Sequence, residues 1–134
     1  MELVKSIFDN APKTVEYEGK VIRINFDIDT AELVGGGTDN DELKRTTFSA
    51  YVVRVNQPLE RGKVIDAIVS AAYPSDKMQA IINNHFSNLA KIADGKKLDA
   101  DELSHEEEYN AMQEWRKKAK SVASDVMESY LSNI

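Results

Sequence analysis

Residues that could catalyse a reaction or bind a metal are few in this sequence and lie far apart. The chain has two histidines, His85 and His105, and no cysteine. His85 falls on the apolar side of a predicted helix, and no nearby residue completes a catalytic triad with it. His105 precedes the acidic run Glu106–Glu108, but successive helical residues point about 100° apart and cannot converge on one ion. We therefore predict no catalytic residue, no cofactor and no metal site, and a protein that is not an enzyme.

A glycine-rich acidic segment is the part of the sequence that most resembles a loop for binding an ion or a phosphate. Gly35–Gly37 is followed by Asp39, Asp41 and Glu42, whose carboxylates could bind Ca²⁺. The spacing lacks the glycine and the final glutamate of an EF-hand, and a phosphate-binding loop needs Gly-Lys-Ser/Thr rather than acids. Three successive glycines also cost backbone entropy in any ordered element. We interpret residues 33–43 as a surface loop, with Ca²⁺ binding as the alternative.

The charge and hydropathy of the chain argue against nucleic acid and membrane partners. The net charge is −6, and the basic run Arg116–Lys120 interrupts an otherwise acidic chain. Its side chains point in several directions around a helix, which describes a charged surface better than a phosphate-binding patch. No stretch approaches the roughly 18 apolar residues that a membrane helix needs. The first residues include Glu2 and lack the basic start and apolar centre of a secretory signal, so we do not expect secretion by a signal peptide.

Apolar residues between positions 13 and 56 alternate with polar ones, as they do in half-buried strands. Two antiparallel strands are predicted on either side of Gly19, which can take the positive φ of a tight turn. A third strand is predicted over Thr46–Asn56, where β-branched and aromatic residues dominate. Either face of this strand could be buried, because two apolar sets compete: Phe48, Ala50 and Val52 against Tyr51, Val53 and Val55.

In residues 59–133 the apolar residues recur at the helical spacing of three and four, which predicts three helices. The first ends before Pro74, and its apolar face consists of Val64, Ile65, Ile68, Val69 and Ala72. The second is predicted to start from an N-cap at Ser75 and to end at Gly95, which suits a left-handed C-terminal position. The apolar face of this second helix consists of Met78, Ile81, Ile82, His85, Leu89 and Ile92.

The last helix carries the surface that we predict to make protein contacts. Ser104 and Glu107 form a capping-box pattern at its start. A helix of 28 residues from there would span about 40 Å, longer than the rest of a compact domain of this size readily covers. Tyr109 and Trp115 suit a monomer core as well as an interface. We predict that part of the apolar stripe faces a second subunit, in a homo-oligomer for which a dimer is favoured, through Tyr109, Met112, Trp115, Val122, Val126 and Tyr130.

These elements predict one α+β domain over residues 1–134. A small antiparallel β-sheet of about three strands, in residues 13–56, would pack against three α-helices in residues 59–133. A chain of 134 residues is long enough to form a core of its own without disulfides or metal.

The helical part also resembles a module of small proteins encoded by bacteriophages and prophages of gut bacteria. The resemblance covers about half of the chain and lies in five segments: Gly62–Ile68, Tyr73–Asp76, Ala80–Asn84, Glu108–Asn110 and Trp115–Lys120. Pro74 departs from the pattern, in which Thr or Ser commonly follows the tyrosine. The resemblance implies a phage-associated protein of virion or assembly type, located in the host cytoplasm or the virion, without a known reaction.

Two functions follow as expectations. The first is a non-enzymatic phage or prophage structural or assembly protein that contacts itself and another phage protein. The alternative is a regulatory adaptor that binds a host or phage protein through the sheet edge or the Trp115 face.

Overall fold

The computed structural model describes residues 1–34 and 44–132 of the chain. Within these residues, one antiparallel sheet has the order β1-β4-β3-β2 and consists of β1 (Ser6–Phe8), β2 (Val15–Glu18), β3 (Val21–Val34) and β4 (Lys44–Asn56). The same residues contain three helices, α1 (Arg61–Ala72), α2 (Ser75–Ala93) and α3 (Ala100–Ser132). The α+β prediction is confirmed, with one strand more than expected.

The hairpin of β2 and β3 turns at Gly19, whose φ of 67° confirms the predicted turn. The additional strand, β1, pairs with β4 and places Ser6 opposite Ala50. It is only three residues long, too short to show an alternating pattern in the sequence. Of the two competing sets in β4, Val53 and Val55 join the core opposite Ile24 and Ile22 of β3, while Ala50 of the other set is also fully buried but lies outside that core cluster.

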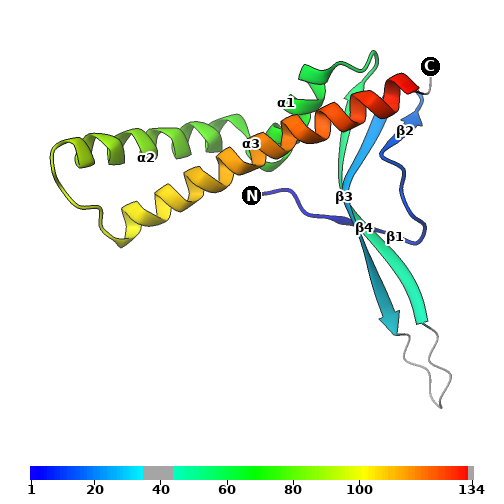
Figure 1. The fold of residues 1–134 in the computed structure, drawn as a ribbon, viewed down its shortest axis with the longest axis horizontal. Helices are drawn as coiled ribbons and strands as arrows, with labels where there is room; N and C mark the ends of the chain where they lie inside the picture. The colour runs from blue at the N-terminus through cyan, green and yellow to red at the C-terminus, as the bar shows by residue number, and fades with distance from the viewer. Residues whose placement is uncertain (35–43, 133–134) are drawn as a thin grey trace.

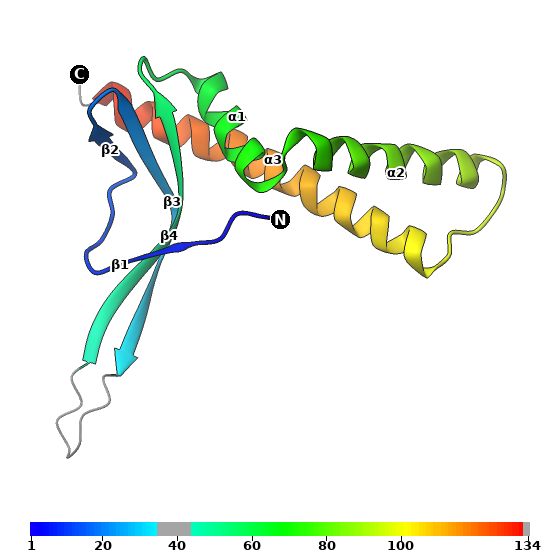
Figure 2. The same ribbon diagram turned by 180° about the vertical axis from the view of Figure 1, so that it is seen from behind.

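Beyond β1 and β2, the strands β3 and β4 continue together as a two-stranded arm that leads away from the helices (Figures 1 and 2). A β-bulge between Phe26 and Asp29, where Asp27 has a φ of 52°, lies at the base of this arm, beside the part of β4 that still pairs with β1. Lys118 of α3 forms an ion pair with Asp27, and Lys5 forms one with Asp29 at 2.5 Å. Both ends of the bulge are therefore held by a lysine from another part of the chain.

The segment predicted as a loop over residues 33–43 starts later than expected. Leu33 and Val34 still belong to β3 and pair with Arg45 and Lys44 of β4. The three glycines and the three acids proposed as Ca²⁺ ligands lie outside the described residues: Gly35, Gly36, Gly37, Asp39, Asp41 and Glu42.

The core lies between one face of the sheet and the helices α1 and α3. Its side chains come from the predicted faces of β3, β4 and α1 and include Ile22, Ile24, Phe26, Val53, Val55, Val64 and Ile68. Trp115 of α3 reaches into this layer, where its indole N–H donates a hydrogen bond of 3.0 Å to the carbonyl oxygen of Ile68 in α1. This bond fixes the long helix against the shorter one.

Helices α2 and α3 form an antiparallel hairpin that projects from the sheet on the side away from the arm (Figures 1 and 2). Pro74 rather than Ser75 is the N-cap of α2, and no side chain caps this end. The helix ends as predicted, with Asp94 as C-cap and Gly95 at a φ of 76°.

Helix α3 begins at Ala100, four residues earlier than predicted. Asp99 and Glu102 form the capping box at its start instead of Ser104 and Glu107. The backbone N–H of Glu102 donates to Asp99 Oδ1 at 2.8 Å, and the N–H of Asp99 donates to Glu102 Oε1 at 3.0 Å. The two sequence patterns are equivalent, and the earlier one also lets Glu102 contact α2.

Candidate functional site

The side chains predicted to form an interface lie mostly within the chain's own core. Met112 and Val126 are fully buried and Trp115 is nearly so. Three others are half-buried against the same core: Tyr109, Val122 and Tyr130. The sheet and the other helices cover more of the stripe than its length suggested. Met112 and Val126 thus have no surface to offer a second subunit, and Trp115 has only a small exposed edge in the groove described below, which corrects the predicted set at these positions.

Apolar surface is instead exposed on the helical hairpin of α2 and α3. The exposed fractions are 60% for Phe86, 45% for Leu89 and 50% for Ile92 in α2, and 52% for Leu103 in α3. We refer to these four residues as the apolar flank. Single exposed apolar residues are common on protein surfaces, but a group of large ones is typical of a contact site.

The exposure of Leu89 and Ile92 corrects the predicted core face of α2. Ile81 is buried as predicted, but Asn88 is also buried and donates a hydrogen bond of 2.9 Å to the carbonyl oxygen of Glu102. Helix α2 packs mainly along α3 and lies beyond the sheet. A helix with one main neighbour buries only a narrow face, so the rest of its apolar stripe remains in solvent.

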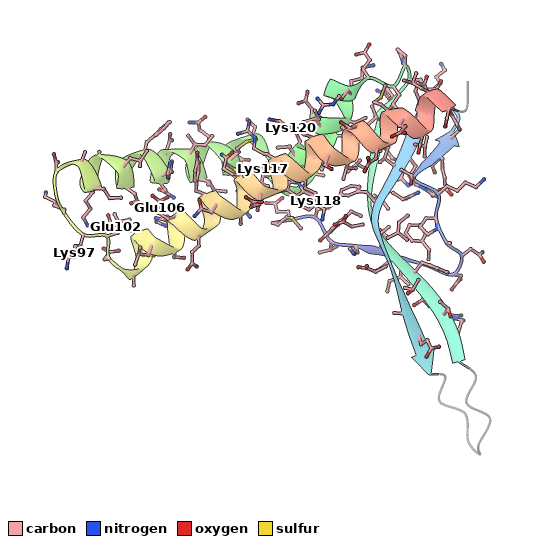
Figure 3. All side chains as sticks on the ribbon, in the orientation of Figure 1. Lys97, Glu102, Glu106, Lys117, Lys118 and Lys120 are labelled. Atoms are coloured by element: carbon pink, nitrogen blue, oxygen red, sulfur yellow. The ribbon has the colours of Figure 1, made fainter. Side chains whose placement is uncertain are left out.

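The contact between His85 and Glu106 shows why residues of both helices share one side of the hairpin. His85 Nδ1 and Glu106 Oε2 lie 2.6 Å apart, and Figure 3 shows Glu106 between the two helices. Leu89 follows His85 by about one turn, and Leu103 precedes Glu106 by about one turn. Because the helices are antiparallel, going from His85 to Leu89 in α2 and going from Glu106 to Leu103 in α3 both lead toward the free end of the hairpin. Each step of about one turn also keeps to the same side of its helix. Leu89 and Leu103 therefore lie next to each other on the flank.

His85 has a structural environment. Its ring stacks on the ring of Tyr109, with 3.6 Å between the centroids and 6° between the planes, and its Nδ1 contacts Glu106. His85 thus joins α2 to α3 through ring stacking on Tyr109 and through the polar contact with Glu106. His105 is half-buried in the first turns of α3.

The free end of the hairpin is held by polar contacts around Glu102. Its carboxylate pairs with Lys91 of α2 and also accepts the N–H of Asp99. The hydrogen bond that Lys91 donates to the Glu102 carboxylate raises the pKa of the Lys91 ammonium above its usual value. The backbone hydrogen bond that Asp99 accepts from Glu102 is the main cause that lowers the pKa of the Asp99 carboxyl. These contacts hold the two helix ends together and keep the apolar flank on a defined surface.

A wide open groove of about 1020 Å³ lies where α3 crosses the sheet. It is lined by the aromatic rings of Tyr51, Tyr73 and Trp115 and by charged residues of both signs. The ion pair of Lys118 with Asp27 stands at its wall. The groove is lined by charges of both signs, and two of its aromatic rings, Tyr51 and Trp115, already pack against each other. Neither feature indicates a catalytic site.

The basic run of α3 does not form one patch. Lys117 lies 3.2 Å from Glu114, and Lys118 pairs with Asp27 of the sheet. Figure 3 shows Lys117, Lys118 and Lys120 around the part of α3 that crosses the sheet. Such dispersed and partly paired lysines agree with the interpretation of this run as a charged helix surface.

The described residues contain neither a metal-binding cluster nor a membrane-spanning helix. Within residues 1–34 and 44–132, no group of three or more His, Asp or Glu side chains is placed to hold a metal ion. Among the helices that the structure describes, none combines the length and the apolar character needed to cross a membrane.

Phe86 and Leu103 are the members of the flank that sequence reasoning missed. Phe86 lies outside the apolar face predicted for α2, and Leu103 was placed in the linker before the last helix. A large aromatic residue away from the predicted core face is the signal that could have identified this surface.

No family model matches this sequence, and no curated protein or solved structure matches it. The function is therefore inferred from the geometry of the surface.

Proposed function

We propose that this protein is a non-enzymatic structural or assembly protein that acts through protein–protein contacts, including contacts with other copies of itself. The observation that carries the proposal is the apolar flank, formed by Phe86, Leu89, Ile92 and Leu103 on a hairpin that projects from the sheet. Exposed apolar groups of this kind lose contact with water when a partner covers them, which drives association.

The rigid presentation of the flank supports the same role. Asn88, Lys91 and Glu102 tie α2 to α3 at the hairpin's end, and His85 stacks on Tyr109 further in. A surface that is already ordered before binding loses less conformational entropy when a partner arrives. The hairpin therefore has the properties of a docking element.

The biological setting is proposed from the sequence pattern. The resemblance of the helical segments to modules of phage and prophage proteins supports a role in a virion or in its assembly, within the host cytoplasm or the particle. A second phage protein is then the natural partner in addition to the chain itself.

A regulatory adaptor is the second candidate, and the two-stranded arm favours it. Beyond the bulge at Asp29, β3 pairs only with β4 among the residues that the structure describes, and no described strand lies along its other edge. An open edge can accept a strand from another protein. In this alternative, a host or phage protein would bind at the arm or beside Trp115.

Sedimentation of the purified chain at tens of micromolar tests the proposal. We expect an oligomer for the native chain and a folded monomer for Leu89→Asp, because a buried charge without a partner is strongly unfavourable at an interface. Ser87→Asp is the matched control, since Ser87 is exposed two residues away, about 200° round the same helix. Circular dichroism should show the same helix content in all three proteins. A native chain that stays monomeric would exclude self-association and leave the adaptor as the better candidate.

A further inference from the structure

We infer that the apolar flank binds the same flank of a second copy, with the two hairpins antiparallel and related by a twofold axis. This inference rests on the proposed function and names the partner and the orientation of the contact. A twofold contact uses one surface twice, so each residue of the flank meets residues of the partner's flank.

The size of the flank matches what a small dimer interface needs. At about 150 to 200 Å² for a large apolar residue, the exposed fractions of the four side chains leave roughly 300 to 400 Å² of apolar surface in water. A standard interface covers about 800 Å² on each partner, and a little over half of that area is apolar. The flank thus supplies most of the apolar area that one partner contributes, and the residues around it supply the rest.

Charges at the two ends of the flank favour the antiparallel orientation. Lys96 and Lys97 are exposed in the connection at the free end of the hairpin, where Figure 3 shows Lys97. Glu107 is exposed and follows Leu103 by about one turn on the side toward the sheet, whereas Glu106 is already in contact with His85. In an antiparallel pair, the lysines of one copy lie opposite the glutamates of the other. In a parallel pair, lysine would meet lysine and glutamate would meet glutamate, which is unfavourable.

The other acids near the free end do not cancel this pattern. The carboxylate of Asp99 is used in the capping box, and that of Glu102 is paired with Lys91. Asp94 and Asp101 each lie two residues from a member of the flank, Ile92 and Leu103 respectively, so they sit about 200° round their helices and face the opposite side. The side that carries the flank is therefore basic at its free end and acidic at its inner end.

Charge reversal in the full chain tests the orientation. In a twofold dimer each pair occurs twice, so Lys97→Glu or Glu107→Lys alone replaces two attractive pairs by two repulsive ones. We expect each single change to raise the dimer Kd about tenfold at low salt, and the double change to return it to within about threefold of the native value. Asp101→Lys on the opposite side is the control and should leave Kd unchanged.

Cysteine cross-linking gives an independent measurement, because the native chain contains no cysteine. A mixture of Lys97→Cys and Glu107→Cys chains should form disulfide-linked heterodimers under mild oxidation. A parallel arrangement would instead link two Lys97→Cys chains to each other.

The outcomes separate the inference from the proposed function. If Leu89→Asp abolishes the dimer but the double reversal is no better than the single ones, the antiparallel arrangement is overturned while self-association stands. Cross-links between two Lys97→Cys chains would overturn it as well. A native chain without any dimer would overturn both.

Discussion

Trp115 of α3 donates its indole N–H to the backbone carbonyl oxygen of Ile68 in α1, across 3.0 Å. Its ring also meets Tyr51 edge to face, with 5.3 Å between centroids and 86° between planes, and lies 5.9 Å from Phe26. The side chain therefore has both a hydrogen-bond partner and aromatic neighbours inside one chain. Trp115 belongs to the folding of the domain, and the contact with a partner that we propose uses the apolar flank of Phe86, Leu89, Ile92 and Leu103 instead.

The change Trp115→Phe should destabilise the fold. It removes the donor to Ile68 and leaves part of the space unfilled, and together these effects should lower the free energy of unfolding by about 2–3 kcal/mol. Urea unfolding should be followed by circular dichroism, because the change removes the chain's single tryptophan. An unchanged midpoint would mean that the indole contributes neither packing nor a hydrogen bond.

The fold class could be predicted because the relevant patterns are local. Alternation predicts β2 and the first part of β3, β-branched and aromatic composition predicts most of β4, and α1 has its predicted face around Val64 and Ile68. A pattern specifies which side of an element is apolar, but the amount of that side that is covered depends on how many neighbours the element has. Helix α2 shows the difference, since Ile81 is buried while Leu89 and Ile92 on the same stripe are exposed.

The candidate site could be predicted only in part for the same reason. The apolar stripe of α3 was visible in the sequence, but its length did not reveal that the sheet and helices cover Met112 and Val126. The flank unites residues of two helices, Phe86 and Leu103 among them, and only the antiparallel packing brings them to one side. A single sequence contains no local signal for such a pairing.

The two possible capping boxes of α3 can be distinguished by a pair of substitutions. Asp99→Ala should lower the free energy of unfolding by about 1 kcal/mol, because the N–H of Glu102 loses its acceptor. Ser104→Ala should have almost no effect, since Ser104 lies inside the helix. Chemical denaturation of both variants gives the comparison. A larger loss for Ser104→Ala would place the start of the helix at the later pattern.

The capping box should also make the free end of the hairpin sensitive to acid. The pKa of Asp99 is lowered from its usual value of 3.8, chiefly by the backbone hydrogen bond from Glu102. A lowered carboxyl pKa stabilises the fold above the unfolded-state value and loses this effect as pH falls through the folded-state value. Amide exchange of residues 100–103, expressed relative to the intrinsic exchange rate at each pH, should therefore accelerate below about pH 4.

Asp99→Asn is the control for that pH dependence. Asparagine caps a helix about as well as aspartate but does not titrate. The variant should retain protection at neutral pH and show a weaker acid-induced acceleration of exchange at residues 100–103. An identical pH profile in both proteins would show that another group causes the change.

Tyr73 should make the core sensitive to alkali. Burial raises the pKa of its phenol above the usual 10.0, and the charge of Glu108 adds to the shift. A raised pKa stabilises the fold below the unfolded-state value and loses this effect as pH rises through the folded-state value. Stability should therefore fall above about pH 10, and Tyr73→Phe should reduce that fall. Tyr17→Phe, at an exposed position, is the matched control in urea unfolding at pH 9 and 11.

The bulge at the base of the arm should respond differently to two substitutions of Asp27. Asp27→Asn removes the half-exposed ion pair with Lys118 and should cost up to about 1 kcal/mol. Asp27→Val removes the same ion pair and also forces a β-branched residue to a φ of 52°, which should cost about 1–2 kcal/mol more. Urea midpoints of the two variants measure the difference. Equal losses would mean that the bulge relaxes to an ordinary strand conformation, and that the ion pair alone determines how the arm leaves the sheet.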